Sequence, residues 1–437
     1  MINQTIKKIF APVMLIFVLV GLGVAQSAQV TEFDINGLKV LVKRRPSAPT
    51  VAAALFVRGG SRNIDDKNAG IEDLMLKSAI EAGKKFPRQT VRREFSRTGS
   101  AIGAGAGEDF SAVSLATTRP NFDRIWDIFA DVILSPVFAE DDIERNRRAT
   151  LSALRETQVS PEGALEAEIA RAIFAGHPYA NDVSGTPANV SRFTAADLAA
   201  YHQKMMQTSR LLLVFVGDLN SDELKTKIAA SFGKLPRGEY KESDTPPLNF
   251  AKPTLDIVAR PNIPTNYVKG VFDAPSLKNP DYYPMQVMIS ILQQMIYQEV
   301  RVNRQLSYAP AAEMEKLAAN TANISVSSTD ANTSVRLMLE QAANMRMRQL
   351  NDEVVSEVAG NFLTTFYLGQ ETSAAQVAEL ARYELIGGGW RNSLEFLDRI
   401  RKVKSADVQS VANKYIKNIR FVVVGKPDAI DRSIFLQ

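Results

Sequence analysis

The spacing of apolar residues predicts that strands and helices alternate along most of the chain. Residues 110–117 and 322–328 are rich in β-forming and small residues, as strands are, and helical spacing follows each of them. Further amphipathic helices are expected at 139–156 and at 352–366. The pattern therefore favours a mixed fold over an all-helical or all-strand one.

The same order of elements occurs twice. A helical pattern beginning near Thr194 leads into an apolar run at 211–217, and one beginning near Ser405 leads into another at 421–425. Thr194 and Ser405 are the expected N-caps of these helices. A long internal repeat indicates duplication. We therefore predict an α+β protein with two homologous domains, each with an antiparallel-rich sheet and helices packed on one face.

A polar stretch at 237–253, with adjacent Pro246 and Pro247, reads as a linker between the halves. This assigns residues 26–236 to an N-terminal domain and residues 254–437 to a C-terminal domain. The total of 437 residues is enough for several domains of roughly 100–200 residues each.

The first residues have the features of an export signal. Lys7 and Lys8 precede an apolar run at 9–25, and small residues follow it. This pattern predicts a signal peptide over residues 1–25 and a periplasmic mature chain that begins near Gln26. The alternative is an uncleaved membrane anchor facing the periplasm, although the run is slightly short of the ~20 residues that a span needs.

Composition excludes several kinds of chemistry. The chain has no cysteine, so disulfides and thiol catalysis are excluded, and it has only two histidines, His177 and His202. Both histidines are expected to make structural contacts, since neither has the neighbours of a metal ligand. The net charge is +4 and no basic run stands out, so we expect no nucleic-acid partner.

Several short motifs, taken in order, resemble the pitrilysin/insulinase family of zinc peptidases, in its processing-peptidase branch. They cover nearly the whole mature chain and are Gly60-Ser61-Arg62, Gly70-Ile71, Gly83 to Pro87, the glycine/alanine-rich segment 99–107, His177-Pro-Tyr, Ser184-Gly-Thr, 193–198, and the segment Arg301 to Tyr308. The resemblance implies a clam-like half-chamber that encloses peptides.

The family's inverted zinc motif, H-x-x-E-H on a helix, is replaced in this chain. Asp73 and Lys77 stand at the two histidine positions, and Leu76 stands at the position of the catalytic glutamate. A later glutamate ligand corresponds to Ala153. A protonated lysine cannot bind zinc, and Leu76 and Ala153 offer no donor atom. We therefore expect no metal or other cofactor in this chain, and an Asp73–Lys77 ion pair in its place.

Two groups of residues are candidates for a remaining function. In paired members of the family, the subunit without zinc supplies an Arg and a Tyr to the substrate carbonyl, and the resemblance assigns these roles to Arg301 and Tyr308. Both are donors suited to an oxyanion. The alternative is a solvated arginine and a core tyrosine. Two positions depart from the family pattern, since Gln305 replaces a usual glycine and residues 293–295 replace a glycine-rich turn.

The second candidate is the segment after residue 101, where an added peptide strand could bind through its backbone. Small side chains would allow close approach, whereas a flexible loop is the competing interpretation. The expected peptide contacts are Ile102, Gly103, Ala104, Gly105 and Ala106.

The leading hypothesis is the non-zinc subunit of an exported heterodimeric metallopeptidase, with a zinc-bearing homologue as partner and a peptide as substrate. Such a chain would have no peptidase activity alone. The alternative is an inactive homologue that acts as a scaffold or peptide-binding protein. A self-sufficient peptidase is disfavoured by the lost ligands.

Overall fold

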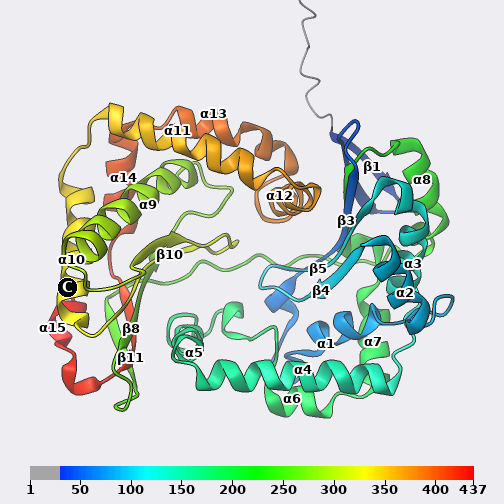
Figure 1. The fold of residues 1–437 in the computed structure, drawn as a ribbon, viewed down its shortest axis with the longest axis horizontal. Helices are drawn as coiled ribbons and strands as arrows, with labels where there is room; N and C mark the ends of the chain where they lie inside the picture. The colour runs from blue at the N-terminus through cyan, green and yellow to red at the C-terminus, as the bar shows by residue number, and fades with distance from the viewer. Residues whose placement is uncertain (1–29) are drawn as a thin grey trace, which may run out of the picture.

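The computed structural model describes residues 30–437 (Figure 1). The predicted signal peptide and its cleavage site lie outside the described residues. Within residues 30–437, no helix is long and apolar enough to cross a membrane.

The first half contains a six-stranded sheet in the order β1-β2-β6-β3-β5-β4. Strands β2 and β6 pair in parallel, and the other neighbours pair antiparallel. The β4 strand is an edge strand. The strands are β1 (Val30–Ile35), β2 (Leu38–Arg44), β3 (Thr50–Arg58), β4 (Ala101–Gly105), β5 (Phe110–Thr118) and β6 (Leu211–Gly217).

The second half repeats this topology. Its five-stranded sheet has the order β7-β11-β8-β10-β9, which matches β2-β6-β3-β5-β4 strand for strand, including the single parallel pair. The structure therefore confirms the two homologous α+β domains. The strands are β7 (Thr254–Ala259), β8 (Asn266–Asp273), β9 (Ala311–Met314), β10 (Thr321–Ser328) and β11 (Arg420–Gly425).

The helices also correspond between the halves. The first half has α1 (Ile71–Ala79), α2 (Arg88–Thr98), α3 (Phe122–Leu134), α4 (Glu140–Val159), α5 (Pro161–Ile173), α6 (Pro187–Arg192), α7 (Ala195–Met205) and α8 (Ser221–Ala230). The second half has α9 (Tyr282–Ile296), a π-helix (Tyr297–Asn303), α10 (Ala331–Met347), α11 (Asp352–Gly369), α12 (Ser373–Ile386), α13 (Phe396–Arg401), α14 (Ser405–Tyr415) and α15 (Arg432–Phe435).

One face of each sheet is covered by helices of its own half, as predicted, and the other face by one helix from the opposite half. Helix α12 packs on β3 and β6, whereas α5 packs on β7, β8 and β11. The strand β6 shows the consequence. Its residues Leu211, Leu213 and Phe215 join the first-half core, while Leu212, Val214 and Val216 pack against α12. Burial on both faces explains its uninterrupted apolar sequence.

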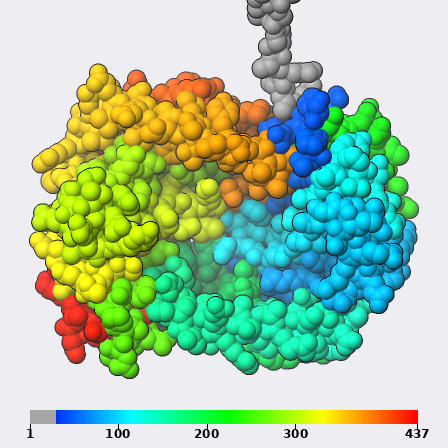
Figure 2. Space-filling model, viewed as in Figure 1, coloured from blue at the N-terminus to red at the C-terminus, as the bar shows by residue number. Residues whose placement is uncertain are grey.

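The predicted linker, residues 237–253, contains neither helix nor strand. The assigned domain boundaries stay predictions, because the exchanged helices α5 and α12 place part of each half on the other. Figure 1 shows α4 and α11 on opposite sides of the molecule, and Figure 2 shows a central hollow between the halves.

Candidate functional site

The helix α1, which carries the replaced zinc motif, is held by a contact between two glycines. Gly70 precedes the helix with φ 91°, and a Cβ atom there would lie 2.9 Å from the Cα of Gly185. Gly185 has φ 87°, and its own Cβ would clash with Ala69 and Gly70. Only glycine fits both positions without strain. Two motifs distant in the sequence, Gly70-Ile71 and Ser184-Gly-Thr, are thus parts of one contact.

Asp73 and Lys77, two positions of the motif compared above, form an ion pair. The Nζ atom of Lys77 lies 2.6 Å from Oδ2 of Asp73, as expected for an i, i+4 pair. The other carboxylate oxygen, Oδ1, accepts a hydrogen bond of 3.3 Å from the backbone N–H of Ala106. Asp73 is buried while Lys77 is partly exposed. The carboxylate therefore already has a cation and a backbone donor as partners.

The remaining positions of the motif do not fit zinc either. Leu76 is 2% exposed and belongs to the first-half core, and Ala153 lies on an exposed face of α4. Across residues 30–437, no group of three or more His, Cys, Asp or Glu side chains is arranged to hold a metal ion. Zinc sites in proteins take three or four such ligands, so these residues do not fit the metal that the family motif binds.

The two histidines bond to backbone groups. His177 Nδ1 accepts from the N–H of Tyr179 at 3.1 Å, and its Nε2 lies 2.9 Å from the carbonyl oxygen of Pro246 in the linker. His202 Nε2 lies 2.7 Å from the carbonyl oxygen of Ile133. Burial lowers the pKa of His202, although its bond to Ile133 opposes that effect. Both histidines have structural contacts of the kind expected from the sequence.

The glycine-rich candidate for peptide binding is a strand and not a flexible loop. β4 covers Ala101–Gly105, and Ala106 follows it directly. It pairs with β5 on one side only, so the other edge is free of a neighbouring strand. The small residues Gly103, Ala104 and Gly105 place no bulky side chain along that strand. Peptide binding at Ile102 to Ala106 stays a prediction.

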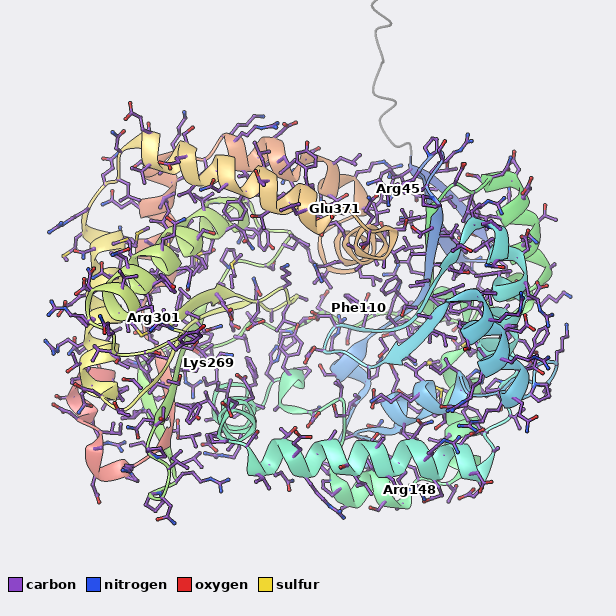
Figure 3. All side chains as sticks on the ribbon, viewed as in Figure 1. Arg45, Phe110, Arg148, Lys269, Arg301 and Glu371 are labelled. Atoms are coloured by element: carbon purple, nitrogen blue, oxygen red, sulfur yellow. The ribbon has the colours of Figure 1, made fainter. Side chains whose placement is uncertain are left out.

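In the second half, the structure brings Arg301 and Tyr308 together. The guanidinium carbon of Arg301 lies 4.5 Å from the centroid of the Tyr308 ring, a cation–π contact. Tyr308 is 80% exposed, so it is not the core aromatic of the competing interpretation. Figure 3 shows Arg301 in the second half, well apart from the α1 region seen in the same view in Figure 1. The two candidate regions therefore do not share one centre within this chain.

The segment that holds this pair has unusual backbone geometry. Arg301 lies in the π-helix, and π-helical turns are rare and frequent at functional sites. Gln305, at the position of the family's usual glycine, has φ 55°. A left-handed conformation costs roughly 1–2 kcal/mol in a residue with a Cβ atom. The hydroxyl of Ser307 is buried and has no hydrogen-bond partner among the described residues. The sequence showed the Gln305 substitution but not this strain.

The fold defines the class of protein, which is a tandem α+β scaffold of two homologous halves. The family model described as "Insulinase (Peptidase family M16)" matches residues 39–187, and the one described as "Peptidase M16 inactive domain" matches residues 192–361. The chain belongs to the pitrilysin/insulinase family, peptidase family M16.

Relatives and solved structures agree with this assignment. An uncharacterized zinc protease of Rickettsia felis is 20% identical over 391 residues, covering 88% of this chain and 94% of the relative. Cytochrome b-c1 complex subunit 1 of Bos taurus is 24% identical over 266 residues, covering 60% and 55%. A crystal structure of a peptidase M16 inactive domain from Pseudomonas fluorescens superposes with a TM-score of 0.82 at 19% identity, covering 91% and 98%. Within this family, the chain is a degenerate peptidase homologue.

Proposed function

We propose that this chain is the non-zinc subunit of an exported heterodimeric zinc metallopeptidase. It supplies one half of the peptide chamber and presents Arg301 and Tyr308 to the substrate carbonyl. The zinc, the base and the attacking water belong to a homologous partner with an intact H-x-x-E-H motif. The export part of the proposal rests on the sequence of residues 1–25.

The observation that carries the proposal is the costly geometry of the segment 297–308. The stack of Arg301 on an exposed tyrosine is accompanied by a π-helix, by a left-handed Gln305 and by a Ser307 hydroxyl that has no partner within residues 30–437. Strained backbone and buried unpaired groups persist where a function requires them. Arginine and tyrosine are also the residues most enriched at the centres of protein interfaces.

The donors of this pair suit a developing negative charge. The Arg301 guanidinium carries N–H donors and lies over the ring of Tyr308, and the exposed Tyr308 side chain carries a hydroxyl donor. In a closed chamber, such donors stabilise an oxyanion more strongly than the ground-state carbonyl. A partner that holds zinc would supply the remaining chemistry.

A second candidate function is a scaffold within a larger assembly. It is favoured by the similarity to cytochrome b-c1 complex subunit 1 and by the structure of Complex III2 from Candida albicans, which covers 93% of this chain with a TM-score of 0.77. Under this alternative, the chain keeps its interfaces and Arg301 and Tyr308 contact protein rather than substrate.

Co-expression with a zinc-bearing homologue distinguishes the two candidates. The subunit hypothesis expects the two chains to co-purify at micromolar concentration, with about one zinc per pair bound in the partner, and only the pair to cleave peptides. The scaffold hypothesis expects a stable complex without peptidase activity. If the chains separate at this concentration, the heterodimer proposal is wrong for that partner.

A further inference from the structure

The two halves meet through the loops that follow their edge strands. Asp109 lies between β4 and β5, and Ala318 and Ala319 lie in the corresponding connection between β9 and β10. Asp109 Oδ1 accepts from the Tyr179 hydroxyl at 2.6 Å, and Oδ2 accepts from the N–H of Ala318 at 2.8 Å. The Tyr179 oxygen accepts from the N–H of Ala319 at 3.2 Å. We call Asp109, Tyr179, Ala318 and Ala319 the seam clamp.

The seam clamp is shielded from water. Asp109 is 4% exposed and Tyr179 5%. Burial, followed by the charge of Asp109, raises the pKa of Tyr179, so its hydroxyl remains a donor at any physiological pH. Hydrogen bonds to a buried carboxylate are stronger than neutral ones, and leaving such a carboxylate without donors is costly.

The first-half side of the clamp is rigidly anchored. The carbonyl oxygen of Glu108 accepts from both the N–H and the hydroxyl of Ser61, at 2.8 and 2.9 Å, and the carbonyl oxygen of Asp109 accepts from Arg62 at 3.0 Å. The ring of His177 accepts from the backbone N–H of Tyr179. The motifs Gly60-Ser61-Arg62 and His177-Pro-Tyr therefore converge on this one contact. Only the bonds to Ala318 and Ala319 reach the second half.

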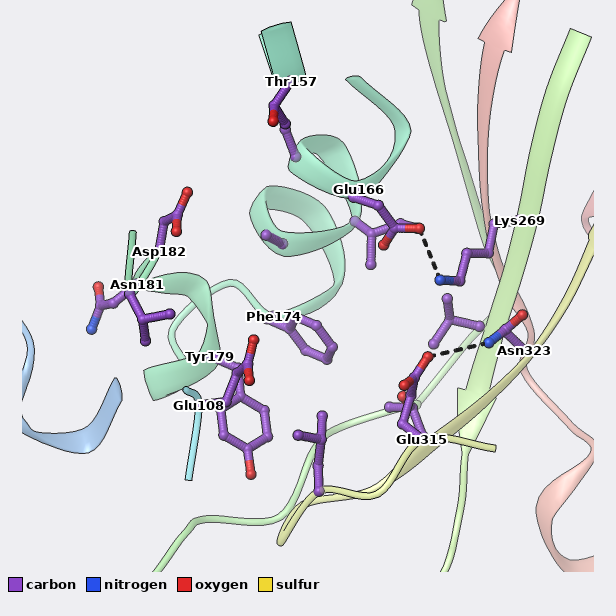
Figure 4. A pocket seen from close by; sticks show the side chains of 17 residues that line it. Glu108, Thr157, Glu166, Phe174, Tyr179, Asn181, Asp182, Lys269, Glu315 and Asn323 are labelled. Atoms are coloured by element: carbon purple, nitrogen blue, oxygen red, sulfur yellow. Dashed lines mark hydrogen bonds and ion pairs between the residues drawn. The ribbon is translucent and has the colours of Figure 1, made fainter. Parts of the chain in front are cut away.

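Next to the clamp, the packing between the halves is incomplete. A cavity of about 400 Å³ lies between α5 and the second sheet. Figure 4 shows that Glu108, Glu166 and Tyr179 line it from the first half, and Lys269, Glu315 and Asn323 from the second. Lys269 and Glu166 form an ion pair of 2.9 Å across it, at a more exposed position. The clamp thus joins the two loops by buried hydrogen bonds next to a cavity that side chains do not fill.

We infer that the seam clamp fixes how the two halves meet at their edge strands, within the arrangement that α5 and α12 already hold, and so keeps the edge strand β4 in a fixed relation to the Arg301–Tyr308 segment. β4 runs into the loop that carries Asp109, and β9 lies between Tyr308 and the clamp. Asp109 and Tyr179 are positioning residues. The inference concerns this chain alone and does not require the proposed heterodimer.

The test is a distance measurement between the halves. The chain has no cysteine, so Arg93→Cys on α2 and Arg336→Cys on α10, both exposed, give two unique sites for spin labels. Pulsed EPR on the purified chain should give one narrow distance distribution. Tyr179→Phe removes one hydroxyl, and Asp109→Ala removes the whole acceptor. Loss of this buried, charge-assisted hydrogen bond frees the loop that holds Ala318 and Ala319, so the distance distribution should become broader or shift its maximum.

Tyr201→Phe is the matched control. Its hydroxyl also donates to a buried carboxylate, Glu72, at 2.6 Å, but both residues belong to the first half. It should lower thermal stability and leave the distance distribution unchanged. The inference is wrong if Tyr179→Phe keeps the parental distribution, or if Tyr201→Phe broadens it equally. Should Asp109→Ala fail to fold, Tyr179→Phe decides the question alone.

Discussion

The replaced zinc motif and the Arg301–Tyr308 segment differ in whether their residues have favourable contacts and ordinary backbone geometry. On α1, Asp73 has an ion pair and a backbone donor, and Leu76 is in the core. Around Arg301, the backbone is π-helical, Gln305 is left-handed and Tyr308 is 80% exposed. On α1, the side chains are ordinary stabilising neighbours. Where strain persists, a retained function is the physical reason we propose.

The largest expected effect is on turnover of the proposed heterodimer. Arg301→Ala or Tyr308→Phe should each lower kcat by about 10²–10³-fold, because an oxyanion donor acts mainly in the transition state. Steady-state kinetics on a defined peptide, with KM and zinc content measured in parallel, provide the check.

Arg304→Ala is the control for charge in the same segment. Arg304 is exposed and pairs with Glu299 at 2.9 Å, so its loss should leave kcat near the parental value. A loss in Arg304→Ala equal to that in Arg301→Ala would show a general charge effect. Parental rates in all three variants would show that the segment has only a structural role.

The second prediction concerns restoring the zinc motif on α1 and α4. The parental chain should bind no stoichiometric zinc, and the combined change Asp73→His, Leu76→Glu, Lys77→His and Ala153→Glu should bring this to about one zinc per chain. The reason is that α1 keeps its anchoring at Gly70 and Gly185. Elemental analysis after dialysis measures the zinc content per chain. Zinc bound by the parental chain would contradict our account of Lys77.

A smaller effect tests the strain itself. Gln305→Gly should raise the free energy of unfolding by ~0.5–1 kcal/mol, since glycine adopts the left-handed conformation without a steric cost but gains entropy when unfolded. Gln305→Ala keeps the Cβ atom and should give no such gain. Denaturant titration of the parent and the two variants compares their free energies of unfolding. Equal stability of the Gly and Ala variants would mean that Gln305 stores no strain.

The smallest expected effect is a pH dependence of folding stability that comes from His202, next to α1. His202 lies on α7, which packs on α1, and burial lowers its pKa. Above about pH 6.5, the histidine is neutral in both states. As pH falls below that value, the unfolded chain takes up a proton that the folded chain resists, so stability is lost towards the lowered folded-state pKa.

His202→Gln keeps a donor for Ile133 but does not titrate. The fall in melting temperature between about pH 7.5 and pH 5.5 should therefore be smaller in this variant than in the parent. Equal falls would show that His202 contributes nothing to the acid sensitivity of this region.

Local features of the fold could be predicted from sequence because they depend on periodicity and short motifs. The strand expected at 110–117 is β5, the helix at 352–366 is α11, and Thr194 caps α7 by accepting from Asp197. The expectation for Ser405 was wrong. Ser405 is the first residue of α14, and its hydroxyl donates to Leu350, while Asp407 accepts from the N–H of Lys404.

Long-range features could not be predicted in this way. Nothing in the amphipathic pattern of α5 says that Leu165 and Ile169 pack against Val422 of the other half. The stack of Arg301 on Tyr308 depends on a π-helix that has no sequence period of its own. Asp109 is a single acidic residue, and its importance comes from two loops that meet only in the folded chain.

The exchanged helices α5 and α12 have a consequence for how such a protein could arise. Each repeat buries one sheet face only under a helix of the other, so a single repeat would expose the apolar residues that α5 or α12 now covers. An ancestor with one repeat would have to form a two-fold dimer that swapped these helices, as domain-swapped proteins do. Gene fusion would then have joined two chains that were already interlocked. Fragments cut in the linker should recombine as a complementing pair and fail to fold separately.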